Sequence, residues 1–278
     1  VSVSLPSHRL DSFMKEDLEK MQSIRKAGLT FAPEAGTQRL RDVINKNVTE
    51  EDLLRATTDA FSCGWTGVKL YFMLGLPEET DEDILGIADL AKKVSDAFYR
   101  LPKEQRGKAL RLTVSASTFV PKPFTAFQWF PQVPLDEIRR RQAILRDALR
   151  GIRGVQFQCH LSDLSVLEAA FSRGDRKLAD VLETAYERGC RFDSWSEHYR
   201  PDAWREAFAA HGCTIEDYAQ WAPSLDETLP WSHIDMLVTE DYLKREYKKA
   251  MQGVTTRDCR QGCNGCFGGR HADACSLS

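Results

Sequence analysis

The sequence lacks most features that would assign it to a class at once. Its 278 residues contain no apolar run near the roughly 20 residues of a membrane-spanning helix, and no signal-like start. No glycine-rich phosphate loop, nucleotide fingerprint or Ser/His/Asp arrangement is evident. The formal net charge of -3 and the pI near 6.1 leave no global basic surface for nucleic acid, and the densest basic run, Arg139 to Arg141, is predicted to be a solvated helix face. We therefore expect a soluble, cytoplasmic protein without a nucleic-acid or membrane partner.

The hydrophobic content of 42% is enough for one large domain or for a domain with an appendage. The chain begins at Val1 without methionine, directly in the strand-like segment "VSVSLPS". This start resembles the middle of a domain. We expect the chain to be a fragment whose partner is the N-terminal half of the same protein.

The first half alternates strand-like and helix-like segments. The second helical stretch, from Thr37 to Phe61, is predicted to break near Asn47. Strands are predicted at "VSVSL", "LTFAPEAG", the apolar run "VKLYFML" and the alternating segment Leu110 to Ser117. A strand followed by a helix, four times over, predicts a parallel sheet of β/α units. Four units are too few to close a barrel, so they form either an open sheet or part of a barrel whose first units are absent.

The character of the chain changes twice. Beyond Gly154 the sequence is mostly helical, and from Thr255 onward it is rich in glycine and cysteine. We therefore divide the chain into β/α units at 1–154, a helical extension at 155–254 and a cysteine-rich tail at 255–278. The tail is too small to fold without a stabilising cross-link such as a bound metal.

Four of the eight cysteines fall in this tail. Three of them, Cys259, Cys263 and Cys266, have the spacing C-x3-C-x2-C, and Cys275 follows. Disulfides are disfavoured in a large acidic chain without a secretory signal, so metal ligation is the better interpretation. Four thiolates complete a closed site for zinc or for an iron-sulfur cluster, with His271 as a less favoured substitute. The other alternative is that the thiols are free.

Two linked segments, "FAPEAGTQRLRDVINKNVTEEDL" and "VKLYFMLGLPEETDED", resemble the radical S-adenosylmethionine superfamily. Four further segments resemble the C-terminal part of uncharacterised radical proteins that carry a cobalamin-binding domain: "SLPSHRLDSF", "STFVPKPFTAFQW", "SRGDRKL" and "DCRQGCNGC". The resemblance implies a partial (β/α) barrel of the TIM type and an enzyme that uses a [4Fe-4S] cluster to cleave S-adenosylmethionine. It also allows cobalamin as a cofactor of the intact protein.

The resemblance places four cofactor-binding residues. Glu34 matches the polar residue that contacts the ribose hydroxyls of S-adenosylmethionine, and Lys46 matches a basic residue that meets the methionine carboxylate. Gly75 and Pro77 match the turn where backbone approaches the adenosyl group. Without the resemblance, Glu34 is equally well a helix cap and Lys46 a solvated cation at a helix end.

In the superfamily the cluster-binding C-x3-C-x2-C follows the first barrel strand, upstream of all these segments. We therefore expect the cluster ligands to lie outside this chain, before Val1, and the tail to be a second metal site of structural or auxiliary type. The alternative is a non-catalytic, metal-stabilised binding module that kept the architecture and lost the chemistry. The sequence identifies neither a substrate nor a catalytic residue.

Overall fold

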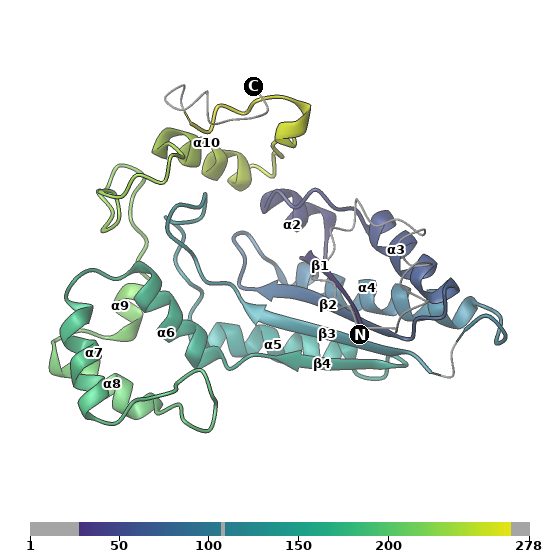
Figure 1. Ribbon diagram of the computed structural model, residues 1–278, viewed down its shortest axis with the longest axis horizontal. Helices are drawn as coiled ribbons and strands as arrows, with labels where there is room; N and C mark the ends of the chain where they lie inside the picture. The colour runs from purple at the N-terminus through teal and green to yellow at the C-terminus, as the bar shows by residue number, and fades with distance from the viewer. Residues whose placement is uncertain (1–27, 107–108, 268–278) are drawn as a thin grey trace, which may run out of the picture. The chain divides into compact units, whose positions relative to one another are not determined.

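The computed structural model describes residues 28–106 and 109–267 (Figure 1). The predicted first strand, "VSVSL", lies outside these residues. The described chain divides into two compact units. The first contains the described residues up to Ser117 and then residues 140–160, and the second contains residues 118–139 and everything after His160.

The first unit is built on one parallel sheet. In the part of the chain that the structure describes, the strands follow the order β1-β2-β3-β4: β1 (Leu29–Glu34), β2 (Gly67–Leu74), β3 (Arg111–Thr118) and β4 (Val155–Cys159). Helices connect them: α2 (Gln38–Val43), α3 (Glu50–Ser62), α4 (Asp81–Arg100) and α5 (Leu135–Leu149). The pairs β1-β2 and β3-β4 are parallel, and the arrows point the same way (Figure 1). This confirms the predicted α/β class and adds a strand, β4, that the sequence analysis did not predict.

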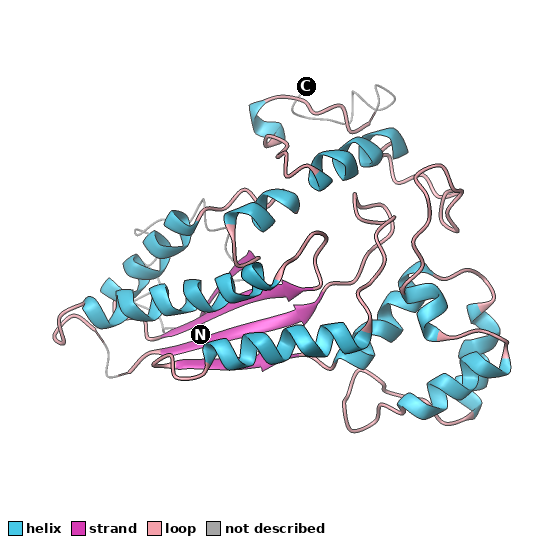
Figure 2. Ribbon diagram, turned by 180° about the vertical axis from the view of Figure 1, so that it is seen from behind, coloured by secondary structure: helices cyan, strands magenta, loops and turns pink. Residues whose placement is uncertain are grey.

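The two faces of the sheet differ in polarity. One face, with Phe31, Leu70 and Val114 among its side chains, is buried under apolar residues of α3, α4 and α5 (Figure 2). The other carries half-buried residues such as Lys69 and Thr113. The alternation predicted for β3 holds except at Ser115, which is buried although it was assigned to the wetter face. β2, predicted as a continuous buried run, alternates between buried and half-buried positions, and its buried residues share a core with α3 and α4.

Hydrogen bonds of the local chain define where α3 begins and α2 ends. The Thr49 hydroxyl accepts a hydrogen bond from the Asp52 backbone N–H at 3.1 Å, and the Asp52 carboxylate accepts one from the Thr49 backbone N–H at 3.1 Å. This reciprocal cap starts α3. The preceding helix, α2, ends at Val43, and Asn45 takes a positive φ of 52°. The predicted break near Asn47 is therefore confirmed.

The second unit is helical. Its described elements are α6 (Ser162–Arg173), α7 (Leu178–Glu187), α8 (Pro201–Ala210), α9 (Ile215–Ala219), α10 (Glu240–Met251) and the short 3-10 turn η2 (Cys259–Gln261). Arg173 is fully buried and donates to the carbonyl oxygens of Ala219, at 2.9 Å, and Trp221, at 2.5 Å. It thus satisfies carbonyls that the end of α9 leaves without helical partners. Among the described residues, no helix is long and apolar enough to cross a membrane.

Candidate functional site

Glu34 lies at the carboxyl end of β1. The strand pairing shifts between Phe31 and Glu34, so that Glu34 stands opposite Phe72 of β2. Glu34 also has a positive φ of 69°, a conformation that a residue with a β-carbon seldom adopts. A bulge at the end of a strand re-aims a side chain, and strained backbone of this kind concentrates at functional sites. The geometry singles out Glu34 independently of any sequence motif.

Lys46 joins Glu34 at this edge. Its Nζ lies 3.1 Å from Glu34 Oε1, although twelve positions separate the two in the chain. The backbone N–H of Lys46 donates to the carbonyl of Arg41 at 2.8 Å, which fixes the turn after α2. Both side chains stay partly exposed, 34% for Lys46 and 24% for Glu34. The two candidate residues therefore form one accessible site with an anion and a cation side by side.

The turn after β2 carries the other two candidates, Gly75 and Pro77. Gly75 has a φ of 87°, which favours glycine, and its backbone N–H donates to Glu79 Oε2 at 2.7 Å. Both Gly75 and Pro77 are buried. Since parallel strands present their carboxyl ends at the same edge, this turn follows β2 on the edge where Glu34 ends β1.

Glu79 anchors that turn, a role that sequence reasoning missed. Its side chain is 1% exposed and accepts from Arg141 Nη1 of α5 at 2.7 Å. Burial raises the pKa of Glu79 to about 7, although the Gly75 N–H and the charge of Arg141 act against it. Arg141 is 14% exposed, so the prediction of a solvated face for Arg139 to Arg141 is wrong at this position. The available signal was the carboxylate four residues after Gly75.

Asp83 ties the two segments together. It accepts hydrogen bonds from the Thr37 hydroxyl and the Arg39 guanidinium, both in the segment after β1, and from the Thr80 backbone N–H at 2.8 Å. Burial alone would raise the pKa of Asp83, but these hydrogen bonds together outweigh it and lower the pKa. A β-carbon on Gly36 would lie 2.1 Å from the Asp83 carbonyl oxygen. The start of α2 and the first turn of α4 thus pack in direct contact.

The described tail cysteines, Cys259, Cys263 and Cys266, follow α10 in the chain, and Cys266 contacts its start. The carbonyl oxygen of Cys266 accepts from the Thr239 backbone N–H, at the start of α10, at 2.9 Å, and the Gly265 N–H donates to Cys263 Sγ at 3.3 Å. Within residues 28–106 and 109–267, no three cysteine, histidine or acidic side chains are arranged to hold a metal. Cys275 lies outside the described residues. The four-cysteine site of Cys259, Cys263, Cys266 and Cys275 therefore stays a prediction.

Residues 1–91 match the family described as the radical SAM superfamily, and this range includes Glu34, Lys46, Gly75 and Pro77. An uncharacterized protein of Methanocaldococcus jannaschii is 33% identical over 183 residues, which cover 66% of this chain and 37% of that relative. The chain thus spans little more than a third of the relative's length. No solved structure matches the chain. A radical S-adenosylmethionine domain is therefore identified at residues 1–91.

Proposed function

We propose that this chain is part of a radical S-adenosylmethionine enzyme and that the carboxyl edge of β1 and β2 binds S-adenosylmethionine. The observation that carries the proposal is the accessible pair of Glu34 and Lys46, with Nζ and Oε1 3.1 Å apart, inside the range that matches the superfamily. S-adenosylmethionine offers both groups that such a pair recognises, vicinal hydroxyls and a carboxylate.

Each residue has a distinct part in this proposal. The Glu34 carboxylate accepts hydrogen bonds from the ribose hydroxyls, and the Lys46 ammonium pairs with the methionine carboxylate. The turn at Gly75 and Pro77 contacts the adenosyl group. Glu79 holds this turn in place by accepting hydrogen bonds from the Gly75 backbone N–H and from Arg141. The bound cofactor, with a reduced [4Fe-4S] cluster, would supply radical initiation.

We place the cysteine ligands of that cluster upstream of Val1. The length of the relative, of which this chain aligns with only 37%, supports a longer protein with room for them. The tail cysteines then form a second site for zinc or an iron-sulfur cluster, and a cobalamin-binding domain belongs to the same longer protein. A non-catalytic module remains the second candidate, and the coding sequence before Val1 separates the two: a C-x3-C-x2-C after a strand supports the enzyme.

The test is S-adenosylmethionine affinity, measured by calorimetry on the complete protein prepared without oxygen. Glu34→Gln keeps the size of the side chain and removes the charge that holds Lys46, so we expect affinity to fall by roughly tenfold. The control is Glu78→Gln, an exposed glutamate of the neighbouring turn, which should leave affinity unchanged. Equal affinity of the Glu34 variant and the wild type would refute the assignment.

A further inference from the structure

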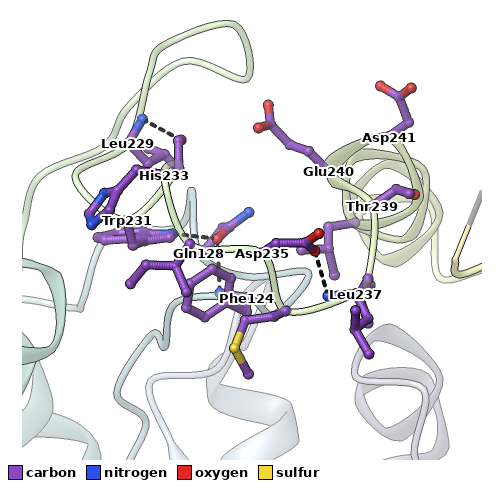
Figure 3. Close-up of a pocket in the computed structure, with 15 residues that line it drawn as sticks. Phe124, Gln128, Leu229, Trp231, His233, Asp235, Leu237, Thr239, Glu240 and Asp241 are labelled. Atoms are coloured by element: carbon purple, nitrogen blue, oxygen red, sulfur yellow. Dashed lines mark hydrogen bonds between the residues drawn. The ribbon is translucent and has the colours of Figure 1, made fainter. Parts of the chain in front are cut away.

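A cavity of about 540 Å³ lies within the second unit. It is lined by residues from the loop after β3, by the loop 229–239 and by the first turn of α10 (Figure 3). Its volume falls in the range of small-molecule sites. None of the residues proposed to bind S-adenosylmethionine or a tail metal lines it, so its role is separate from the proposed function.

Gln128 gives this cavity a fixed hydrogen-bond donor. Its Oε1 accepts from the Trp231 ring Nε1 at 2.7 Å and from the Phe124 backbone N–H at 2.9 Å. Both neighbours can only donate, so the oxygen must face them and the amide Nε2 must face away. Figure 3 shows this nitrogen turned into the space between the loop and α10.

That nitrogen has no partner among the described residues. Gln128 is only 3% exposed, and the hydrogen bonds of its side chain both fall on Oε1, while its backbone N–H donates to the carbonyl of Thr125. The nitrogen keeps accessible surface, so a ligand in the cavity can reach this donor. A carbonyl oxygen of a ligand would be a suitable acceptor for it.

The rest of the lining selects the charge of the ligand. Phe124, Trp231 and Leu243 provide apolar surface, while Asp235, Glu240 and Asp241 are acidic. No lysine or arginine lines the cavity in the part of the chain described. Glu240 pairs with Lys244 at 2.8 Å, and the same ammonium attracts Asp241 electrostatically without forming a salt bridge with it among the described residues. Acidic groups beside aromatic faces favour an organic cation.

We propose that this cavity binds a small organic cation that also carries an amide or ketone carbonyl. The carbonyl oxygen accepts from Gln128 Nε2, the hydrocarbon part packs on Trp231, and the ammonium lies at the acidic rim near Asp241. Gln128 lies in the loop after β3 and Asp241 lies in α10. A ligand with only the carbonyl or only the ammonium therefore contacts only one of these two residues.

Three probes separate the two halves by calorimetry on the chain. N-acetyl-L-lysine amide carries both groups, N-acetyl-L-norleucine amide has the carbonyls without the charge, and n-butylamine has the ammonium without a carbonyl. We expect the lysine amide to bind the wild type at least tenfold more tightly than either of the others. Failure of the lysine amide to bind, or equal binding of all three probes, would overturn the proposal.

Two variants assign the contributions. Gln128→Glu keeps an acceptor oxygen for Trp231 and Phe124 and replaces the inward donor with an acceptor oxygen. The added negative charge acts on both cationic probes, so the preference for the lysine amide over butylamine should disappear. Asp241→Asn should instead reduce the preference over the norleucine amide. Retention of the carbonyl preference in a folded Gln128→Glu protein would contradict the role of Gln128. Should that variant fail to fold, the three-probe comparison on the wild type still decides.

Discussion

At the scale of single residues, Glu79 is a buried carboxyl whose titration is coupled to folding. Burial raises its pKa from 4.5 to about 7, so over this interval the folded chain holds a proton that the unfolded chain has already lost. Stability from this group is therefore present in full below about pH 4.5 and falls as the pH rises to about 7. Above that interval the loss is complete.

Glu79→Gln tests this coupling. The variant cannot ionise, so the part of the stability loss between about pH 4.5 and pH 7 that Glu79 causes, at most about 3 kcal/mol, should vanish. Urea unfolding at several pH values measures the slope. The matched control, Glu78→Gln, changes an exposed carboxyl in the same turn and should keep the wild-type slope. An unaltered slope for Glu79→Gln would show that this carboxyl does not titrate as described.

The sequence predicted some site residues well and others not at all. Glu34 and Lys46 were placed by motif, but their pairing depends on the bulge between Phe31 and Glu34, which arises from the register with β2. Glu79 and Gln128 act through partners 62 and 103 positions away in the chain, Arg141 and Trp231. The distant partners leave no local pattern, and the local contacts of Glu79 with Gly75 and of Gln128 with Phe124 do not by themselves identify a functional role.

At the scale of elements, the contact between the start of α2 and α4 sets the geometry of the candidate site. The backbone of Gly36 lies so close to α4 that an added β-carbon would meet the Asp83 carbonyl oxygen at 2.1 Å and the Ile87 backbone nitrogen at 2.4 Å. Backbone atoms of a helix cannot move aside independently. A side chain at this position must push the two elements apart.

We therefore expect Gly36→Ala to destabilise the protein by about 1–3 kcal/mol or more through overpacking. Gly67→Ala, at the start of β2, is the control, because nothing lies within 4 Å of the added carbon. Thermal and urea unfolding compare the two variants. Equal stability of Gly36→Ala and Gly67→Ala would mean that α2 and α4 are not in the close contact described.

Local signals were sufficient for most elements. An apolar run located β2, alternation located β3, and the predicted helical stretch with its break near Asn47 contains α2 and α3. The strand β4 was missed although "VQFQC" alternates, because it has five residues and none of them is fully buried. Its place in the sheet comes from pairing with β3, Leu112 opposite Val155, a contact between residues 43 positions apart.

At the scale of the whole molecule, the two units hold different chemistry. The first contains the Glu34 and Lys46 site at the edge of a parallel sheet, and the second contains the Gln128 cavity and the described tail cysteines. The match over residues 1–91 concerns the first unit alone. We therefore expect substitutions of Glu34 or Lys46 to weaken S-adenosylmethionine binding without changing ligand binding in the Gln128 cavity.

The most direct test of the central claim is the formation of 5'-deoxyadenosine from S-adenosylmethionine by the complete, reduced protein, loaded with iron and sulfide without oxygen. We expect the product to form with the wild type and Glu34→Gln to lower its rate of formation at limiting S-adenosylmethionine. Absence of 5'-deoxyadenosine from a protein with a full [4Fe-4S] content would contradict this expectation, and would favour the non-catalytic module.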